Sequence, residues 1–68
     1  MAIDYNSVMT FDIDDTVEHL EHPDYGIGTV VRIARYSRRM SQMLVFWPSR
    51  GMKTWHWASE LTHKKVNS

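Results

Sequence analysis

The chain has 68 residues, eight Lys or Arg, eight Asp or Glu and no cysteine. A chain this short forms one domain with a small core, because it buries only about 60% of the surface that its unfolded form exposes. The lack of cysteine excludes disulfides, thiol catalysis and thiolate metal ligands. The first fifteen residues lack the features of a signal peptide, and the longest apolar run, Met43 to Trp47, is too short to cross a bilayer. We therefore expect a soluble, cytoplasmic protein that makes no membrane contact.

Charge is segregated along the chain although the net charge is zero. Residues 1–24 hold seven acids and no Lys or Arg, whereas residues 25–68 hold all eight bases and one acid, Glu60. In one interpretation the two halves neutralise each other across neighbouring strands, and in another the basic half faces nucleic acid or an acidic protein. The first interpretation is favoured, because both halves fold together in so small a domain.

Short β-rich runs alternate with turn signals from Thr16 onward, a pattern typical of a small barrel or sandwich. Strands are predicted at Thr16–Leu20, Gly28–Tyr36, Met43–Trp47 and Met52–Trp57, followed by a 3₁₀ turn and a short closing strand within Ala58–His63. The connections between them are a polar loop, Ser37–Gln42, and a turn, Pro48–Gly51. Because Met43–Trp47 is apolar throughout, it is the expected central strand, covered on both faces. The sequence thus predicts one all-β domain of about five strands.

The stretch HPDYGIGTVVRI, from His22 to Ile33, has two closely spaced glycines that could suggest a phosphate-binding loop. A dinucleotide or P-loop motif requires its glycines to lead into a helix, whereas here Thr29 to Ile33 favours a strand. Gly26 and Gly28 are better interpreted as positions that need a positive φ or that leave no room for a Cβ at a sharp bend.

Alternation in MKTWHW places Lys53, Trp55 and Trp57 on one face, and Thr54 and His56 on the other. A core this small cannot hold every aromatic side chain. By alternation with Leu44, we expect Phe46 and Trp55 to be buried, which leaves Trp47 and Trp57 half exposed.

Two segments, DDTVEHLEHPDYGIGTVVRI and MLVFWPSRGMKTWHWASELTH, resemble a known family. They are similar to the Tudor-like, SH3-barrel module at the C-terminus of UvrD-type DNA repair helicases, and more distantly to the RNA-polymerase-interaction domains of CarD-like transcription factors and the transcription-repair coupling factor. The matching positions are Asp15, Val17, His22, Tyr25, Gly26, Gly28, Val30, Leu44, Phe46, Gly51, Lys53, Trp55 and Leu61. The chain departs from the pattern in its inserted HLE before His22 and in its tryptophan-rich TWHW.

The resemblance covers about residues 14–63 and implies an SH3-like barrel, which agrees with the five predicted strands. From the sequence outside this range we expect an acidic N-terminal segment at 1–13 and a flexible tail at 64–68. The N-terminal segment is expected to be partly ordered or to add an edge strand. The family motif mainly specifies architecture. It implies a non-catalytic adapter that binds RNA polymerase, another transcription or repair protein, or nucleic acid.

Neither a metal site nor an enzyme is expected from the sequence. The spacing of His19, His22, His56 and His63 matches no standard zinc motif, and no cysteine adds a ligand. His22 is expected to stabilise its turn by a hydrogen bond. No local motif predicts a catalytic residue or a cofactor, and a barrel of this size has little interior volume for a substrate.

A binding function is the remaining class, and the expected residues are aromatic and basic. For a protein partner they are Tyr36, Arg38, Arg39, Trp47, Arg50, Lys53 and Trp57, since Tyr, Trp and Arg are common interface anchors. For single-stranded nucleic acid, the alternative ligand, they are Arg32, Arg35, Arg38, Arg39 and Trp47. An aromatic cage for a methylated cation is a further variant. A homodimer is also possible, with Ser7–Phe11 as the exchanged strand.

Overall fold

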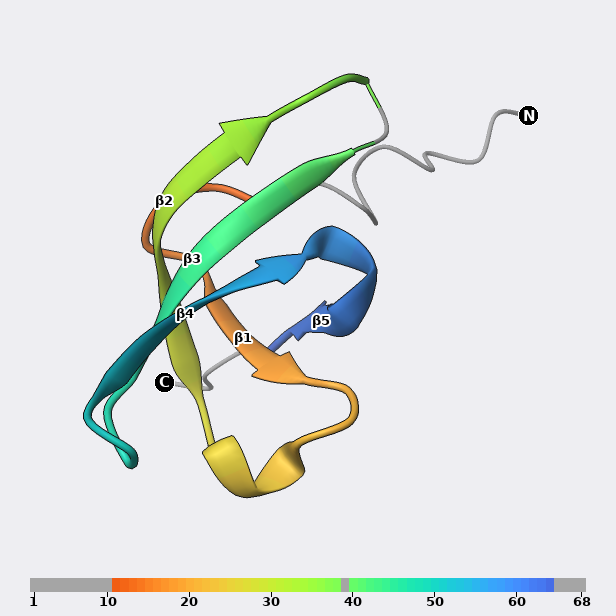
Figure 1. The fold of residues 1–68 in the computed structure, drawn as a ribbon. Coiled ribbons are helices and arrows are strands. Elements are labelled where there is room, and N and C mark those ends of the chain that lie inside the picture. The colour runs from red at the N-terminus through yellow and green to blue at the C-terminus, as the bar shows by residue number, and fades with distance from the viewer. Residues whose placement is uncertain (1–10, 39, 65–68) are drawn as a thin grey trace.

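The computed structural model describes residues 11–38 and 40–64 (Figure 1). In chain order they form β1 (Thr16–His19), the 3₁₀ turn η1 (Pro23–Tyr25), β2 (Gly28–Arg35), β3 (Ser41–Trp47), β4 (Met52–Trp57), the 3₁₀ turn η2 (Ala58–Glu60) and β5 (Leu61–His63). The described part of the chain is therefore all-β, as predicted. Its only helical elements are the two 3₁₀ turns, and none of its helices is long and apolar enough to cross a membrane.

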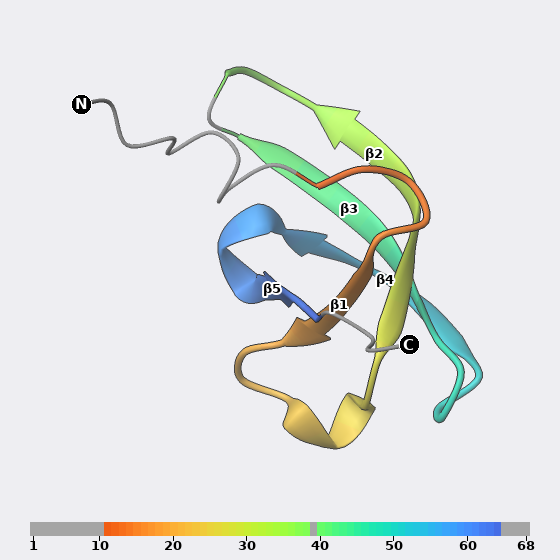
Figure 2. The ribbon, with the colours of Figure 1, turned by 180° about the vertical axis from the view of Figure 1, so that it is seen from behind.

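The strands form one antiparallel sheet of five strands in the order β4-β3-β2-β1-β5. β2 pairs with β1 at its first two residues and with β3 along most of its length. A bulge between Val30 and Arg32 bends β2 just beyond its pairing with β1. The sheet curls, so that β1 and β5 lie across the core from β3 and β4 (Figures 1 and 2).

The predicted strands are confirmed to within two residues. β4 has the predicted bounds, and a 3₁₀ turn and a short strand occupy Ala58–His63 as expected. β1 and β2 each end one residue early, and β3 begins two residues early, so that Ser41 and Gln42 belong to a strand and not to the loop. β3 has a neighbour on each edge, although the middle strand of the five is β2.

Most of the predicted N-terminal segment and part of the predicted tail lie outside the described residues. In these two segments the residues outside the described part are 1–10 and 65–68. Residues 1–10 include most of the proposed exchange strand, Ser7–Phe11. Phe11 is described, and it is a core residue: it is 4% exposed, and its ring stacks on His63 with the centroids 4.2 Å apart. The packed unit therefore includes a residue before the predicted barrel boundary at position 14.

The register between β3 and β4 decides which side chains face the core. Trp47 lies opposite Met52, and Met43 opposite His56, and these positions point inward. The alternate positions, which include Leu44 and Phe46, point outward and are only half buried, so the prediction that β3 is covered on both faces is wrong. The buried core consists of Phe11, Val17, Val30, Met43, Val45, Trp47 and Leu61.

Trp47 is fully buried, which corrects the prediction that it is half exposed. Its indole N–H donates a hydrogen bond of 2.8 Å to Thr54 Oγ1, so the one polar group of the ring has a partner inside the protein. The ring fits because position 28 has no side chain: a Cβ on Gly28 would lie 2.6 Å from Trp47 Cε3 and 2.5 Å from Val45 Cγ1.

Both glycines of the HPDYGIGTVVRI stretch serve the backbone in the way expected. Gly26 has a φ of 75°, where a residue with a Cβ is strained, and its N–H closes η1 by donating to the Pro23 carbonyl at 3.1 Å. Gly28 is required by the close approach of the Trp47 ring. The interpretation of this stretch as a structural bend is confirmed.

Gly28→Ala is expected to lower the free energy of unfolding by about 1–3 kcal/mol, because the new methyl overpacks the contact with Val45 and Trp47. Urea unfolding followed by tryptophan fluorescence measures this change. Gly51→Ala is the matched control: nothing lies within 4 Å of its added Cβ, so it carries only the cost of its positive φ. A Gly28→Ala protein as stable as the wild type would contradict this account of the core.

Candidate functional site

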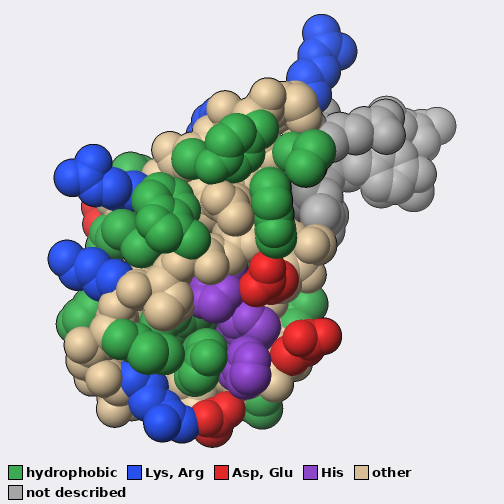
Figure 3. Space-filling model, in the orientation of Figure 1, with side chains coloured by type: hydrophobic (Ala, Val, Ile, Leu, Met, Phe, Trp, Pro, Cys, Tyr) green, Lys and Arg blue, Asp and Glu red, His purple; other side chains and the backbone are tan. Residues whose placement is uncertain are grey.

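The outward side chains of β2, β3 and β4 form one continuous surface. The strand register arranges them in three rows, namely Ala34, Gln42 and Trp57; Arg32, Leu44 and Trp55; and Thr29, Phe46 and Lys53. We name these nine residues, together with Tyr36, the outer face. Trp55 is 47% exposed and Trp57 is 38% exposed, so two large rings lie open to solvent on it. Figure 3 shows hydrophobic side chains gathered on this side of the molecule, with Lys and Arg side chains beside them.

Tyr36 extends the aromatic part of the outer face beyond the end of β2. Its ring centroid lies 5.9 Å from that of Trp57, and the two ring planes are tilted by 54°. Its hydroxyl donates a hydrogen bond of 3.0 Å to Gln42 Oε1, which fixes the ring against β3. Tyr36 is itself 62% exposed, so three aromatic side chains are available to a ligand.

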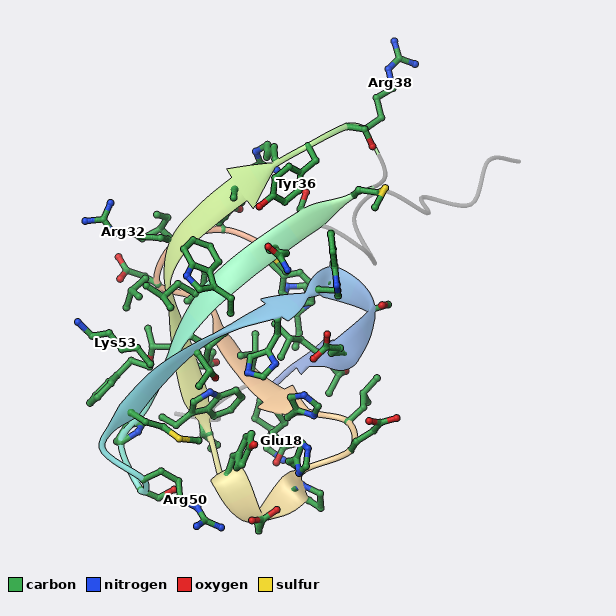
Figure 4. All side chains as sticks on the ribbon, viewed as in Figure 1. Glu18, Arg32, Tyr36, Arg38, Arg50 and Lys53 are labelled. Atoms are coloured by element: carbon green, nitrogen blue, oxygen red, sulfur yellow. The ribbon has the colours of Figure 1, made fainter. Side chains whose placement is uncertain are left out.

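Arg32 and Lys53 supply the positive charge of the outer face. Figure 4 shows both side chains leaving the sheet on the same side. Neither one makes an ion pair with any residue that the structure describes. Since none of the ten residues of the outer face is acidic, the exposed rings lie beside positive charge that this surface does not neutralise.

The structure brings together Tyr36, Lys53 and Trp57, which were predicted to bind a protein partner, and Arg32, which was predicted to bind nucleic acid. It separates others from them. Arg35 lies opposite Ser41 at an alternate position of β2, so its side chain leaves from the other surface of the sheet.

Three further predicted residues lie away from the outer face or cannot be placed. Arg38 points away from the sheet, at the end of the loop after β2 (Figure 4). Arg50 lies in the turn between β3 and β4, where it forms an ion pair with Asp24 and its guanidinium carbon is 5.8 Å from the centre of the Tyr25 ring. Arg39 lies outside the described residues.

The tryptophans require the main correction. Alternation correctly placed Leu44, Phe46 and Trp55 on one surface, but this surface faces solvent and not the core. Trp47 therefore cannot contact a partner in this conformation, because no part of it is exposed. Trp55, which the sequence analysis expected to be buried, is the most exposed of the three tryptophans and belongs to the candidate site.

Neutralisation between the acidic and basic halves of the chain occurs away from the outer face. Asp24 pairs with Arg50, and Glu18 Oε2 lies 4.0 Å from Lys64 Nζ. These pairs link β1 and η1 to the later strands. They leave the charge of Arg32 and Lys53 on the outer face.

A second arrangement, on the inner side of the sheet, joins three elements through polar side chains. His19 of β1 and His56 of β4 are 4% and 8% exposed, and both direct a ring nitrogen at Glu60 of η2. The distances to Glu60 Oε1 are 3.1 Å from His19 Nε2 and 2.8 Å from His56 Nδ1. We name His19, His56 and Glu60 the imidazole–carboxylate cluster.

The neighbours of the cluster define the direction of its hydrogen bonds. The Glu21 amide donates to His19 Nδ1 at 3.1 Å, so Nε2 carries the proton of a neutral His19 and donates it to Glu60. On the other side, Trp47 donates to Thr54 Oγ1, which leaves the Thr54 hydroxyl free to donate to His56 Nε2. Nδ1 of His56 then donates to the same carboxylate, and every polar atom of the chain of bonds has a partner.

Glu60 remains a carboxylate because its hydrogen bonds outweigh its burial. Burial is the largest single influence and raises the pKa, but hydrogen bonds from His56, from the Trp57 amide and from His19 lower it, and together they place the pKa of Glu60 below its ordinary value. The Trp57 amide donates to Glu60 Oε2 at 3.2 Å. Both carboxylate oxygens are thus held in place.

Comparisons of the chain with protein-family models, with curated proteins and with solved structures find no match. The resemblance to helicase tails and to CarD-like domains therefore remains a prediction that depends on the sequence motif.

The sequence analysis missed Trp55 and the imidazole–carboxylate cluster for different reasons. Trp55 was assigned to the correct group of side chains, but no local signal showed which group faces the core. His19 and His56 come from separate strands, so their linear spacing has none of the regularity of a zinc motif. Only the pairing of β1 with β5, which follows η2, brings them together.

We expect Glu60→Gln to lower the free energy of unfolding at pH 7 by on the order of 1 kcal/mol, because an ionised acceptor of three hydrogen bonds is lost. The folded-state pKa of Glu60 lies below its ordinary value of 4.5, so the stabilisation by its ionised form is present above that pH and is lost as the pH falls through the folded-state pKa. Urea unfolding of both proteins, in the presence of a metal chelator, gives the free energy of unfolding of each. The difference between the two values should become smaller as the pH falls from 5 to 3. A difference that stays constant over this range contradicts the assignment.

Proposed function

We propose that this protein is a non-catalytic binding module with an SH3-like barrel fold, and that the outer face is its binding surface. The observation that carries the proposal is the exposure of Trp55 and Trp57 on a sheet face that also presents Arg32 and Lys53 without acidic partners among the described residues. Exposed tryptophan rings gathered with tyrosine and arginine are the typical anchors of a binding surface.

The partner proposed is a protein. Tyr36, Trp55 and Trp57 provide rigid apolar area, and the half-buried Leu44 and Phe46 continue it across β3. Desolvation of such a surface by a partner gains hydrophobic free energy, while Arg32 and Lys53 at its side select a partner with complementary negative charge. The resemblance to helicase tails and CarD-like domains makes RNA polymerase, or another transcription or repair protein, the first candidate.

A second candidate ligand is single-stranded nucleic acid. It is favoured by one observation, namely that Trp55 shares a row with Arg32 and a strand with Lys53, so that a base could stack on the ring while the cations contact phosphates. The zero net charge of the chain and the acids of residues 11–24 weaken non-specific attraction to a phosphate backbone.

Fluorescence anisotropy of the labelled full chain, titrated separately with purified RNA polymerase core enzyme and with a single-stranded oligonucleotide, tests the proposal. Trp55→Ala and Trp57→Ala should each weaken binding of the polymerase by about tenfold or more, as expected for anchor residues. Leu20→Ala is the matched control, because Leu20 is 59% exposed and lies in the loop after β1, away from the outer face.

Salt dependence separates the two ligands. Oligonucleotide binding that weakens steeply with salt, and that is weaker in Arg32→Gln and Lys53→Gln, would identify nucleic acid, and not a protein, as the ligand of the outer face. If wild type and both tryptophan variants bind neither ligand or bind equally well, the outer face is not the binding surface for these partners and the proposal fails.

A further inference from the structure

The imidazole–carboxylate cluster has the composition and the geometry of a transition-metal site. One ring nitrogen of His19, one of His56 and a Glu60 carboxylate oxygen all lie within 4.8 Å of one another. The nitrogens that face Glu60 are His19 Nε2 and His56 Nδ1. Two imidazoles and one carboxylate are a ligand set that Zn²⁺ accepts in proteins, with a fourth position left for water or another ligand. The N···O distances of 3.1 and 2.8 Å are hydrogen-bond lengths, and ligands about 2 Å from one tetrahedral ion lie about 3.3 Å apart, so the side chains need to separate by only a few tenths of an ångström to admit the ion.

We propose that His19, His56 and Glu60 bind one Zn²⁺ ion. The site is independent of the outer face, because its residues point to the inner side of the sheet. No zinc site was expected from the sequence spacing, since the ligands come from β1, β4 and η2 and are assembled only by the fold.

Packing holds the three ligand side chains close together, and the site has an open side. His19 and His56 are held by packing: their ring centroids are 4.6 Å apart, and the Trp47 ring lies 5.8 Å from His56 and 6.4 Å from His19. The Glu60 side chain is 35% exposed, which gives an ion a path to the carboxylate and gives solvent access to the fourth position. Packing therefore restricts the two imidazole rings before an ion binds, which lowers the entropy cost of binding.

Zinc binding to the neutral form of each histidine changes the tautomer of the ring. The ion takes the place of the protons on His19 Nε2 and His56 Nδ1, and each proton moves to the other nitrogen of its ring. At His56 this nitrogen faces Thr54 Oγ1, which can accept the new N–H bond and act as an outer-shell partner.

At His19 the same change breaks an existing hydrogen bond, because Nδ1 becomes a donor that faces the donor N–H of Glu21. Nδ1 now accepts from the Glu21 amide, and once it carries a proton it can no longer do so. Glu21 is exposed, so its amide can turn to solvent. The amide of Glu21 is therefore a local reporter for zinc at His19 Nε2.

Isothermal titration of chelator-treated full chain with Zn²⁺ is the test. We expect one ion per chain, and an affinity at least tenfold lower in Glu60→Gln and His56→Gln, because each loses a ligand. His63→Gln is the matched control and should bind as the wild type does, whereas His22 is left unchanged because its ring lies 4.7 Å from that of His19. His63 is chosen because with Asp15 it forms a second, exposed imidazole–carboxylate pair.

Two measurements on the wild-type protein test the zinc proposal even if a variant fails to fold. Zn²⁺ should shift the Glu21 amide signal in a ¹H–¹⁵N spectrum, and Co²⁺ should broaden the signals around His19, His56 and Glu60 first. The absence of binding by the wild type overturns the proposal. So does binding that leaves the Glu21 amide unchanged, that survives Glu60→Gln and His56→Gln in folded protein, or that disappears in His63→Gln.

Discussion

The buried indole of Trp47, at the end of β3, determines which surface of β3 and β4 faces the core. The ring needs the absent side chain of Gly28 for space and the Thr54 hydroxyl for its N–H. Because Trp47 pairs with Met52 across the β3–β4 ladder, its inward position also turns Thr54 and His56 inward. Lys53, Trp55 and Trp57 must then point outward. One buried ring thus decides which side chains the protein presents to solvent.

Because His56 points inward, its buried ring needs hydrogen-bond partners, and the imidazole–carboxylate cluster provides them. A buried imidazole without hydrogen-bond partners is costly, and here Thr54 and Glu60 occupy its two nitrogens. Glu60 also accepts from His19, so the same carboxylate joins β1 to β4 through η2. The apolar core and the polar cluster are therefore continuous through Trp47 and Thr54. This small domain has few core residues, and the cluster adds a second set of contacts that joins β1 to β4.

The sequence predicted the elements well and their orientation poorly. Strand bounds followed from β-rich runs and turn residues, and the roles of Gly26 and Gly28 followed from the strand after them. Orientation did not follow, because MLVFW is apolar at every position and either set of alternate residues could form the core. In MKTWHW the pattern predicted that Trp55 is buried, because Thr and His are usually surface residues. In the structure Thr54 and His56 point inward and Trp55 is exposed. The imidazole–carboxylate cluster could not be predicted for a different reason: His19, His56 and Glu60 meet only after the sheet has formed.

A measurement of the solvent exposure of each indole can show which surface of β3 and β4 faces the core. Hydrogen exchange of the three indole N–H protons, assigned with Trp47→Phe, Trp55→Phe and Trp57→Phe, reports separately on each ring. The account predicts that the Trp47 proton exchanges slowly, because it is buried and bonded to Thr54, and that the Trp55 and Trp57 protons exchange rapidly. A slowly exchanging Trp55 proton together with a rapidly exchanging Trp47 proton would show that the opposite surface of β3 and β4 faces the core, and would contradict the account.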